Sequence, residues 1–336
     1  MADAEIRKEA AGEKAPLLQV DHLKTHFDVT KGLFSPKQIV KAVDDVSFYV
    51  GEGETYGLVG ESGCGKSTLG RTLVKIYPAT GGKILYKGQD IARLGKEEEK
   101  HFRKEVQMIF QDPYASLNPR MTVGEIIKEP MEIHGILDSS KDREDRAAEL
   151  LKTVGLKPDH IRRYPHEFSG GQRQRISIAR TLALNPRFII CDEPISALDV
   201  SIQAQIINLL KEIQNELGIS YLFVAHDLSM VNYISHRIGV MYLGHLVEEG
   251  PADQVYEHPI HPYTEALMNC LPKLTGNGIA EGIPGRIPDY SSPPKGCRFA
   301  PRCPYALKKC QNERPVRHEV DGDHWVACFQ AEEGRS

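Results

Sequence analysis

Features that would place this 336-residue chain within a membrane, outside the cell or on nucleic acid are missing. No segment holds the roughly 20 consecutive apolar residues of a membrane-spanning helix. The N-terminal tail, residues 1–16, is polar and lacks the apolar segment of a secretory signal. A formal net charge of −4 provides no basic surface for nucleic acid. We therefore expect a cytoplasmic protein that binds no nucleic acid and meets a membrane only through partners.

The sequence lacks the tight CxxC cysteine pairs common in zinc ribbons. In a cytoplasmic chain, the seven cysteines indicate reduced thiols or metal ligands rather than disulfides. Four of them, separated by five, six and seventeen residues, are Cys297, Cys303, Cys310 and Cys328. Four thiolates accept either Zn²⁺ or an iron-sulfur cluster, so these residues alone leave both open.

The apolar periodicity predicts an α/β fold. Alternating patterns over Leu17–Phe27 and Ile39–Val50 indicate two strands of an antiparallel layer. A short buried strand is expected at Thr55–Val59, followed by glycines and a helix over Ser67–Ile76. Apolar residues at helical spacing between 123 and 155 then predict a helical insertion.

After the insertion, helices and strands alternate, which predicts a parallel sheet covered by helices. The expected elements are helix Gln172–Leu184, strand Arg187–Cys191, helix Ser201–Leu217, strand Tyr221–Val224 and strand Ile238–Met241. From about residue 250, prolines exclude long helices except near Tyr263–Cys270. We therefore expect a main domain over residues 17–250, with a helical subdomain at about 112–184, and a small Cys- and Pro-rich region over 251–336.

The segment after the strand at Thr55–Val59 has the chemistry of a phosphate-binding loop. It fits the pattern G-x-x-x-x-G-K-[ST], in which glycines let backbone amides approach phosphates and the next helix adds its positive end. Lys66 is expected to contact the β- and γ-phosphates, and Ser67 to ligate Mg²⁺. The residues expected around the nucleotide here are Gly60, Ser62, Gly63, Cys64, Gly65, Lys66, Ser67 and Thr68.

Two acids end a second buried strand. Asp192 follows four apolar residues, so its carboxylate is expected beside Mg²⁺, and Glu193 comes next. Alone, an Asp-Glu pair is more typical of a solvated strand end. In a chain that also carries Lys66 in a phosphate loop, the pair indicates a phosphate site with Mg²⁺.

Between these motifs lies Phe168-Ser169-Gly170-Gly171-Gln172. In this order and spacing, the three motifs resemble the ATP-binding cassette (ABC) family of ATPases. The resemblance implies a P-loop nucleotide-binding domain with a RecA-like parallel-sheet core, an antiparallel β layer and a helical subdomain. It also implies a sandwich dimer, because in this family Ser169, Gly170, Gly171 and Gln172 cap the ATP held by the partner.

The same resemblance implies catalytic roles for four residues. Glu193 polarises the attacking water, and Lys66 holds the phosphates. Gln111, in Phe110-Gln-Asp-Pro113, is similar to the Q-loop glutamine that reaches Mg²⁺ and the water and connects to the membrane partner. His226 is similar to the switch histidine that contacts the γ-phosphate.

Two further positions follow from the resemblance. Asp199 ends a segment, Ser196-Ala-Leu-Asp199, that matches the D-loop, although Ile195 stands where related chains usually carry Thr. Phe27 is the candidate for stacking on adenine, and Phe34 is the alternative.

Several longer segments resemble the ATPase subunits of bacterial dipeptide and oligopeptide importers, and the likeness extends from Leu17 to Cys328. The segments are Gln111–Ile127, Tyr164–Gly171, His258–Thr264 and Gly296–Pro304. For the four C-terminal cysteines this resemblance favours a [4Fe-4S] cluster, with Zn²⁺ as the alternative.

The resemblance also implies a setting for the protein. It predicts a peripheral ATPase on the cytoplasmic face of the inner membrane, working with two permease subunits and an extracytoplasmic solute-binding protein. A second, homologous ATPase subunit is expected, which makes a heterodimer, and a homodimer remains open. The alternatives for function are import of nickel chelates or another small solute, and a regulatory nucleotide-binding subunit with weak hydrolysis.

Overall fold

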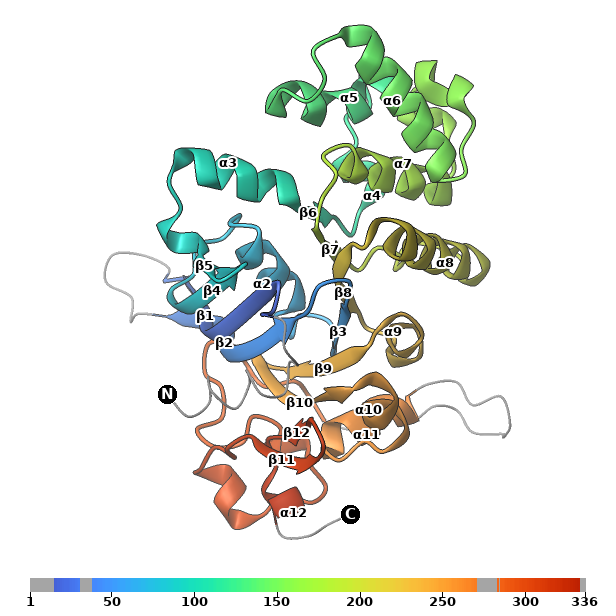
Figure 1. The fold of residues 1–336 in the computed structure, drawn as a ribbon. Helices are drawn as coiled ribbons and strands as arrows, with labels where there is room; N and C mark the ends of the chain where they lie inside the picture. The colour runs from blue at the N-terminus through green and yellow to red at the C-terminus, as the bar shows by residue number, and fades with distance from the viewer. Residues whose placement is uncertain (1–14, 31–37, 271–282, 284, 333–336) are drawn as a thin grey trace. The chain divides into compact units, whose positions relative to one another are not determined.

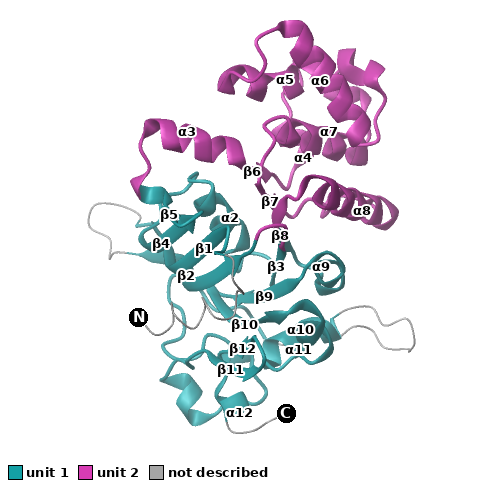
Figure 2. Ribbon diagram, viewed as in Figure 1, with its two compact units in different colours: residues 1–51, 55–92, 223–336 teal, residues 52–54, 93–222 magenta. Residues whose placement is uncertain are grey.

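The computed structural model describes residues 15–30, 38–270, 283 and 285–332. The chain forms two compact units (Figure 2). Unit 1 combines residues 1–51, 55–92 and 223–336, and unit 2 combines residues 52–54 and 93–222. Strand β8 (Ser220–Ala225) crosses from one unit to the other. None of the helices that the structure describes is long and apolar enough to cross a membrane.

Unit 1 contains the antiparallel layer that the alternating sequence predicts. Its strands are β1 (Leu18–Asp28), β2 (Ile39–Val50), β4 (Gly81–Tyr86) and β5 (Gln89–Asp90). They pair in the order β2-β1-β4-β5, and each pairing is antiparallel. Along much of β1 and β2, buried residues, most of them apolar, alternate with less buried ones, so one face of this sheet packs on the core.

A second sheet in unit 1 joins the nucleotide-binding core to the C-terminal region. The five strands of this sheet that lie wholly in unit 1 are, in spatial order, β11 (His318–Asp321), β12 (His324–Val326), β10 (His245–Pro251), β9 (Arg237–Tyr242) and β3 (Thr55–Val59). Strand β3 runs parallel to β9, and the remaining pairings in this group are antiparallel. Every residue of β3 and β9 is buried, as their apolar runs predict.

The helices of unit 1 are short. They are α2 (Lys66–Leu73), α9 (Leu228–Ile234), α10 (Ala252–Glu257), α11 (Pro262–Asn269) and α12 (Phe329–Glu332) (Figure 1). Helix α2 directly follows the glycine-rich loop after β3, which confirms the strand-loop-helix prediction. Helix α11 lies where the sequence left room for a helix among prolines, with Pro262 at its first position.

Unit 2 is mostly helical around one parallel strand pair. Its elements are α3 (Lys96–Glu105), β6 (Val106–Ile109), α4 (Pro113–Ser116), α5 (Val123–His134), α6 (Ser140–Thr153), α7 (Gly170–Leu182), β7 (Phe188–Asp192) and α8 (Val200–Leu217). Strand β6 is parallel to β7. Helices α5 and α6 confirm the predicted helical insertion. Capping side chains define where they begin: Thr122 caps α5 and Ser139 caps α6.

Three carboxylates in unit 1 are buried and depend on bases from the C-terminal region. Asp44 pairs with Arg298. Burial alone would raise the pKa of the Asp44 carboxyl, but the Arg298 guanidinium beside it holds this pKa below its ordinary value. Glu249 pairs with Arg317 at 2.7 Å and with Arg237 at 2.8 Å. Glu248 pairs with His324 at 2.8 Å and accepts the backbone N–H groups of residues 260 and 261. A buried charge that loses its partner is strongly destabilising, so the core and the C-terminal region stabilise each other.

The pair of His324 and Glu248 provides a test of this dependence. Both side chains are at most 3% exposed. We expect His324→Ala to lower the free energy of unfolding by about 3 kcal/mol, because it leaves the Glu248 carboxylate without its base. The control is His318→Ala, whose imidazole is 29% exposed and lies 3.9 Å from Glu332. Denaturant unfolding should show a change below about 0.5 kcal/mol for the control; equal losses in the two variants would contradict the prediction.

Candidate nucleotide site

The phosphate loop, residues 60–67 in unit 1, is held close to neighbouring backbone at two glycines. A Cβ atom on Gly60 would lie 2.2 Å from the Met241 carbonyl oxygen. A Cβ atom on Gly65 would lie 2.1 Å from the Ala42 carbonyl oxygen, and the φ of Gly65 is +112°. Only glycine fits at either position, so these residues fix the path of the loop between β3 and α2.

The predicted phosphate-binding lysine lies over this loop. Lys66 is buried, and its Nζ donates to the carbonyl oxygens of Gly60 at 2.7 Å and Glu61 at 3.0 Å. Ser67 and Thr68 follow in the first turn of α2, whose N-cap is Gly65. Burial raises the pKa of the Cys64 thiol, although Lys66 lowers it, so Cys64 is a neutral loop residue. The structure therefore places the predicted phosphate-binding residues together at one helix N-terminus.

Contacts from the C-terminal region also hold the loop, and the sequence did not predict them. The Glu61 N–H donates to the Tyr263 hydroxyl at 2.7 Å. Arg302 donates to both Glu61 carboxylate oxygens, at 2.6 and 3.1 Å. Because 241 residues separate Arg302 from Glu61, no local pattern signals the pair.

The remaining predicted residues of unit 1 lie on β1 and after β8. Phe27 is half-buried, and its ring meets that of Tyr77 edge to face at a centroid distance of 5.2 Å. The alternative adenine contact, Phe34, lies outside the described residues. His226 is exposed and directly precedes Asp227, which caps α9. The roles of Phe27 and His226 stay predictions.

Unit 2 brings Gln111 and Glu193 together. The Gln111 Nε2 donates to Glu193 Oε2 at 2.8 Å, although 82 residues separate them. Asp192 ends β7 with 1% exposure, as its apolar neighbours predict. Glu193 follows with a φ of +46°, a left-handed conformation that non-glycine residues seldom adopt. Such strained backbone clusters at functional sites, where the surrounding structure holds it.

The predicted signature segment begins helix α7. The Ser169 Oγ accepts the Gln172 N–H at 3.4 Å, and the Gln172 Oε1 accepts the Ser169 N–H at 3.0 Å, which forms a capping box. Gly170 and Gly171 occupy the first turn, and a Cβ atom on Gly171 would lie 2.5 Å from Ile202 Cγ2. The predicted D-loop residue, Asp199, is the N-cap of α8.

No disulfide joins the four C-terminal cysteines, all of which the structure describes. Burial, with smaller contributions from the nearby Cys310 and Cys328 thiols, raises the pKa of Cys297 to about 11. Amides hydrogen-bond to these sulfurs: those of residues 299 and 300 to Cys297, and those of residues 330 and 331 to Cys328. Within the part of the chain that the structure describes, no group of three or more His, Cys, Asp or Glu side chains is arranged to hold a metal ion.

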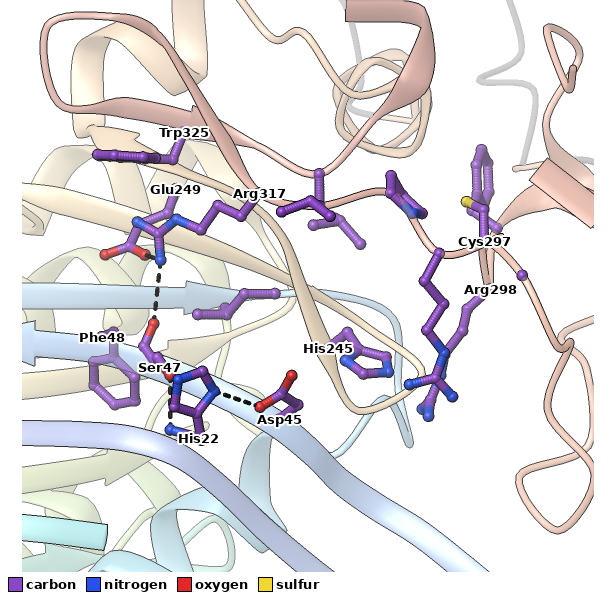
Figure 3. A pocket seen from close by; sticks show the side chains of 18 of the residues that line it. His22, Asp45, Ser47, Phe48, His245, Glu249, Cys297, Arg298, Arg317 and Trp325 are labelled. Carbon is purple, nitrogen blue, oxygen red and sulfur yellow. Dashed lines mark hydrogen bonds and ion pairs between the residues drawn. The ribbon is translucent and has the colours of Figure 1, made fainter. Parts of the chain in front are cut away.

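A cavity of 430 Å³ lies in unit 1 beside Cys297 (Figure 3). Its walls come from β2, from β10 and from the C-terminal segment that contains Arg314 and Arg317. Arg317 donates to the Ser47 carbonyl at 3.3 Å and its guanidinium lies 5.0 Å from the centroid of the Trp325 ring. These contacts join the C-terminal segment to β2 across one side of the cavity.

Two family models match the chain. The model described as "ABC transporter" matches residues 43–196, which include the phosphate loop, the signature and the two acids. The model described as "Oligopeptide/dipeptide transporter, C-terminal region" matches residues 247–310, which include Arg302 and three of the four cysteines.

Individual proteins show the same similarity over most of the chain. The putative oligopeptide transport ATP-binding protein YkfD of Bacillus subtilis is 54% identical over 94% of this chain and 95% of its own length. The dipeptide transport ATP-binding protein DppF of Escherichia coli is 48% identical over 95% of each. Among solved structures, the dimeric cassette MJ0796 bound to ADP and Pi is 28% identical, with a TM-score of 0.62 over 70% of this chain and 98% of that one.

The capping box of α7 generates a prediction with an internal control. Ser169→Ala should lower stability by about 1 kcal/mol through the lost cap, and it should also weaken ATP-dependent dimerisation. Thr122→Ala removes an equivalent capping box from α5, where Thr122 Oγ1 accepts the Glu125 N–H. It should cost similar stability and leave dimerisation unchanged. Unfolding and size-exclusion measurements with ATP distinguish the two effects, and equal dimerisation by both variants would contradict the assignment of Ser169.

Proposed function

Because the chain belongs to the ABC transporter ATPases, in their oligopeptide and dipeptide transport branch, we propose that it is the ATP-hydrolysing subunit of an importer of short peptides. One observation carries this proposal: a single chain combines the ABC match over residues 43–196 with the peptide-transporter match over residues 247–310. An ATPase subunit does not itself enclose the cargo. Nickel chelates or another small solute are therefore the alternative cargo for the same architecture.

The phosphate loop supplies the groups that bind the triphosphate of ATP. Lys66 already extends over the loop, where it donates to two neutral carbonyls. The β- and γ-phosphate oxygens are stronger acceptors for its ammonium, because hydrogen bonds between charged groups are stronger than those to neutral ones. Ser67, Gln111 and Asp192 are the residues that would hold Mg²⁺, which neutralises phosphate charge when bound.

Glu193 is the residue proposed to accept a proton from the attacking water. The hydrogen bond from Gln111 fixes the orientation of its carboxylate, and a positioned carboxylate acts as a general base. His226 is proposed to contact the γ-phosphate, and Phe27 to stack on adenine.

A sandwich dimer is proposed to complete two copies of the site. In each copy, the ATP held by one subunit is faced by residues of the other: Ser169, Gly170, Gly171, Gln172 and Asp199. A helix N-terminus suits this role because its amides and dipole favour anions.

The partners are proposed from the same branch of the family. Two membrane permeases receive the conformational change, a second homologous ATPase completes a heterodimer, and an extracytoplasmic binding protein delivers the peptide. This arrangement places the chain at the cytoplasmic face of the inner membrane. A soluble ATPase stimulated by DNA is the contrasting function, and the net charge of −4 gives it no support.

The four C-terminal cysteines are proposed to hold a [4Fe-4S] cluster, with Zn²⁺ as the alternative. The Cys310 thiol is close enough to raise the pKa of both Cys297 and Cys328, and backbone amides hydrogen-bond to the sulfurs of Cys297 and Cys328. Hydrogen bonds to the sulfurs are a feature of Fe–S centres, so these contacts support the proposal. Its contribution is proposed to be structural.

Replacement of the proposed base tests the enzymatic function. Glu193→Gln should lower ATP turnover at least about 100-fold, because the amide accepts no proton from water, while ATP binding is retained and the ATP-bound dimer persists. Glu149→Gln, on the exposed face of α6, is the control and should match the wild type. If the wild-type protein in its assembled complex turns over ATP no faster than Glu193→Gln, the chain is instead a regulatory nucleotide-binding subunit.

Metal analysis after anaerobic purification tests the cysteine proposal. We expect about four iron and four acid-labile sulfide per chain, with visible absorption that bleaches on reduction. Cys310→Ser should lose most of this iron, and Cys270→Ser, outside the four-cysteine set, should retain it. Stoichiometric Zn²⁺ without sulfide would show that the cysteines hold Zn²⁺ and not the cluster. A folded protein without metal would refute both proposals.

A further inference from the structure

Glu61, the first residue after Gly60 in the phosphate loop, is held at three points. The Glu61 N–H donates to the Tyr263 hydroxyl, its carbonyl accepts Lys66, and its carboxylate accepts two hydrogen bonds from Arg302. The Arg302 side chain is 3% exposed and also donates to the carbonyl of residue 283. Its hydrogen bonds to Glu61 raise the pKa of Arg302 above its ordinary value, so the guanidinium is permanently charged. A buried, two-pronged contact of this kind fixes both position and orientation.

A second arginine holds the other end of the loop. Arg298 binds the Asp44 carboxylate and the Leu243 carbonyl, and Figure 3 shows it extending from beside Cys297 toward the β9–β10 turn near His245. The next residue in that turn, Gly244, donates its N–H to the Cys64 carbonyl at 2.8 Å and accepts the Asp44 N–H at 2.9 Å. Arg298 therefore joins β2 to the β9–β10 turn, which contacts Cys64 through Gly244.

We propose that the C-terminal four-cysteine segment positions the phosphate loop for nucleotide, with Arg302 as the principal positioning residue acting through Glu61. This inference rests on the proposed ATPase function. A phosphate loop needs its successive amides directed inward, and the wrong path for even one residue removes donors from the phosphates. Held by Tyr263 and Arg302 at Glu61 and by Gly244 at Cys64, the loop keeps its path before ATP arrives.

The two arginines are the immediate sequence neighbours of two cysteines. Arg298 follows Cys297, and Arg302 precedes Cys303. The segment between them is fixed to the core by Phe299, whose ring packs on Tyr242 and Tyr263 at centroid distances of 5.2 and 5.4 Å. Whatever orders the cysteines therefore also orders both arginines.

Titration with a fluorescent ATP analogue, on the full-length protein, tests the role of Arg302. Arg302→Gln should weaken the affinity about tenfold, a difference of about 1.4 kcal/mol, and Arg302→Lys should fall between this variant and the wild type because it keeps the charge and loses the fork. Glu61→Gln should reproduce the loss. The double variant should bind no more weakly than either single one, because both remove the same interaction.

The control is Arg317→Gln, which breaks a different ion pair of the same C-terminal region, that with Glu249. It should lower the unfolding temperature and leave nucleotide affinity within about twofold. Wild-type affinity in Arg302→Gln and Glu61→Gln, or equal losses in Arg302→Gln and Arg317→Gln, would overturn the inference. If the wild-type protein binds the analogue no better than Lys66→Ala, the proposed function fails instead. Glu61, at 23% exposure, provides a second variant should Arg302→Gln fail to fold.

Discussion

A phosphate loop cannot be stabilised by the backbone amides that it must present to its ligand, and this constraint shapes unit 1. The loop is therefore held through carbonyls and side chains. Ala42 and Met241 approach so closely that only Gly65 and Gly60 fit beside them. Glu61 gives up its own amide to the Tyr263 hydroxyl and its carboxylate to Arg302. The C-terminal region thus supplies part of the framework on which ATP binding depends.

Charge pairing explains why that region is continuous with the core. The acids Asp44, Glu248 and Glu249 are nearly inaccessible to water, and each faces a base from beyond residue 290: Arg298, His324 and Arg317. Because desolvated charges require partners, neither half of this arrangement is stable without the other. Strand β12 adds backbone pairing with β10, so the C-terminal region extends this sheet.

Motifs with a local mechanism were predicted from the sequence, and contacts between distant segments were not. The strand-loop-helix around Lys66, the helix that begins near Gln172 and the helical insertion are confirmed because glycines and apolar spacing act over a few residues. Helix α3 was missed because it buries only Phe102 among charged residues, and β12 because it has three residues. The adjacent Glu248 and Glu249 are typical of an exposed strand end by sequence, and only their distant partners explain their burial. The pairing of Gln111 with Glu193 likewise emerges only from the fold of unit 2.

The central claim is that ATP hydrolysis in this chain drives a peptide importer, and its partners in the membrane test it most directly. The measurement is affinity purification of the tagged protein from detergent-solubilised native membranes under anaerobic conditions, with identification of every co-purifying chain. The account predicts two multispanning permeases and a second cassette ATPase, and the associated binding protein would then identify the cargo. Recovery of soluble partners alone would contradict it and leave an ATP-driven dimer that acts elsewhere.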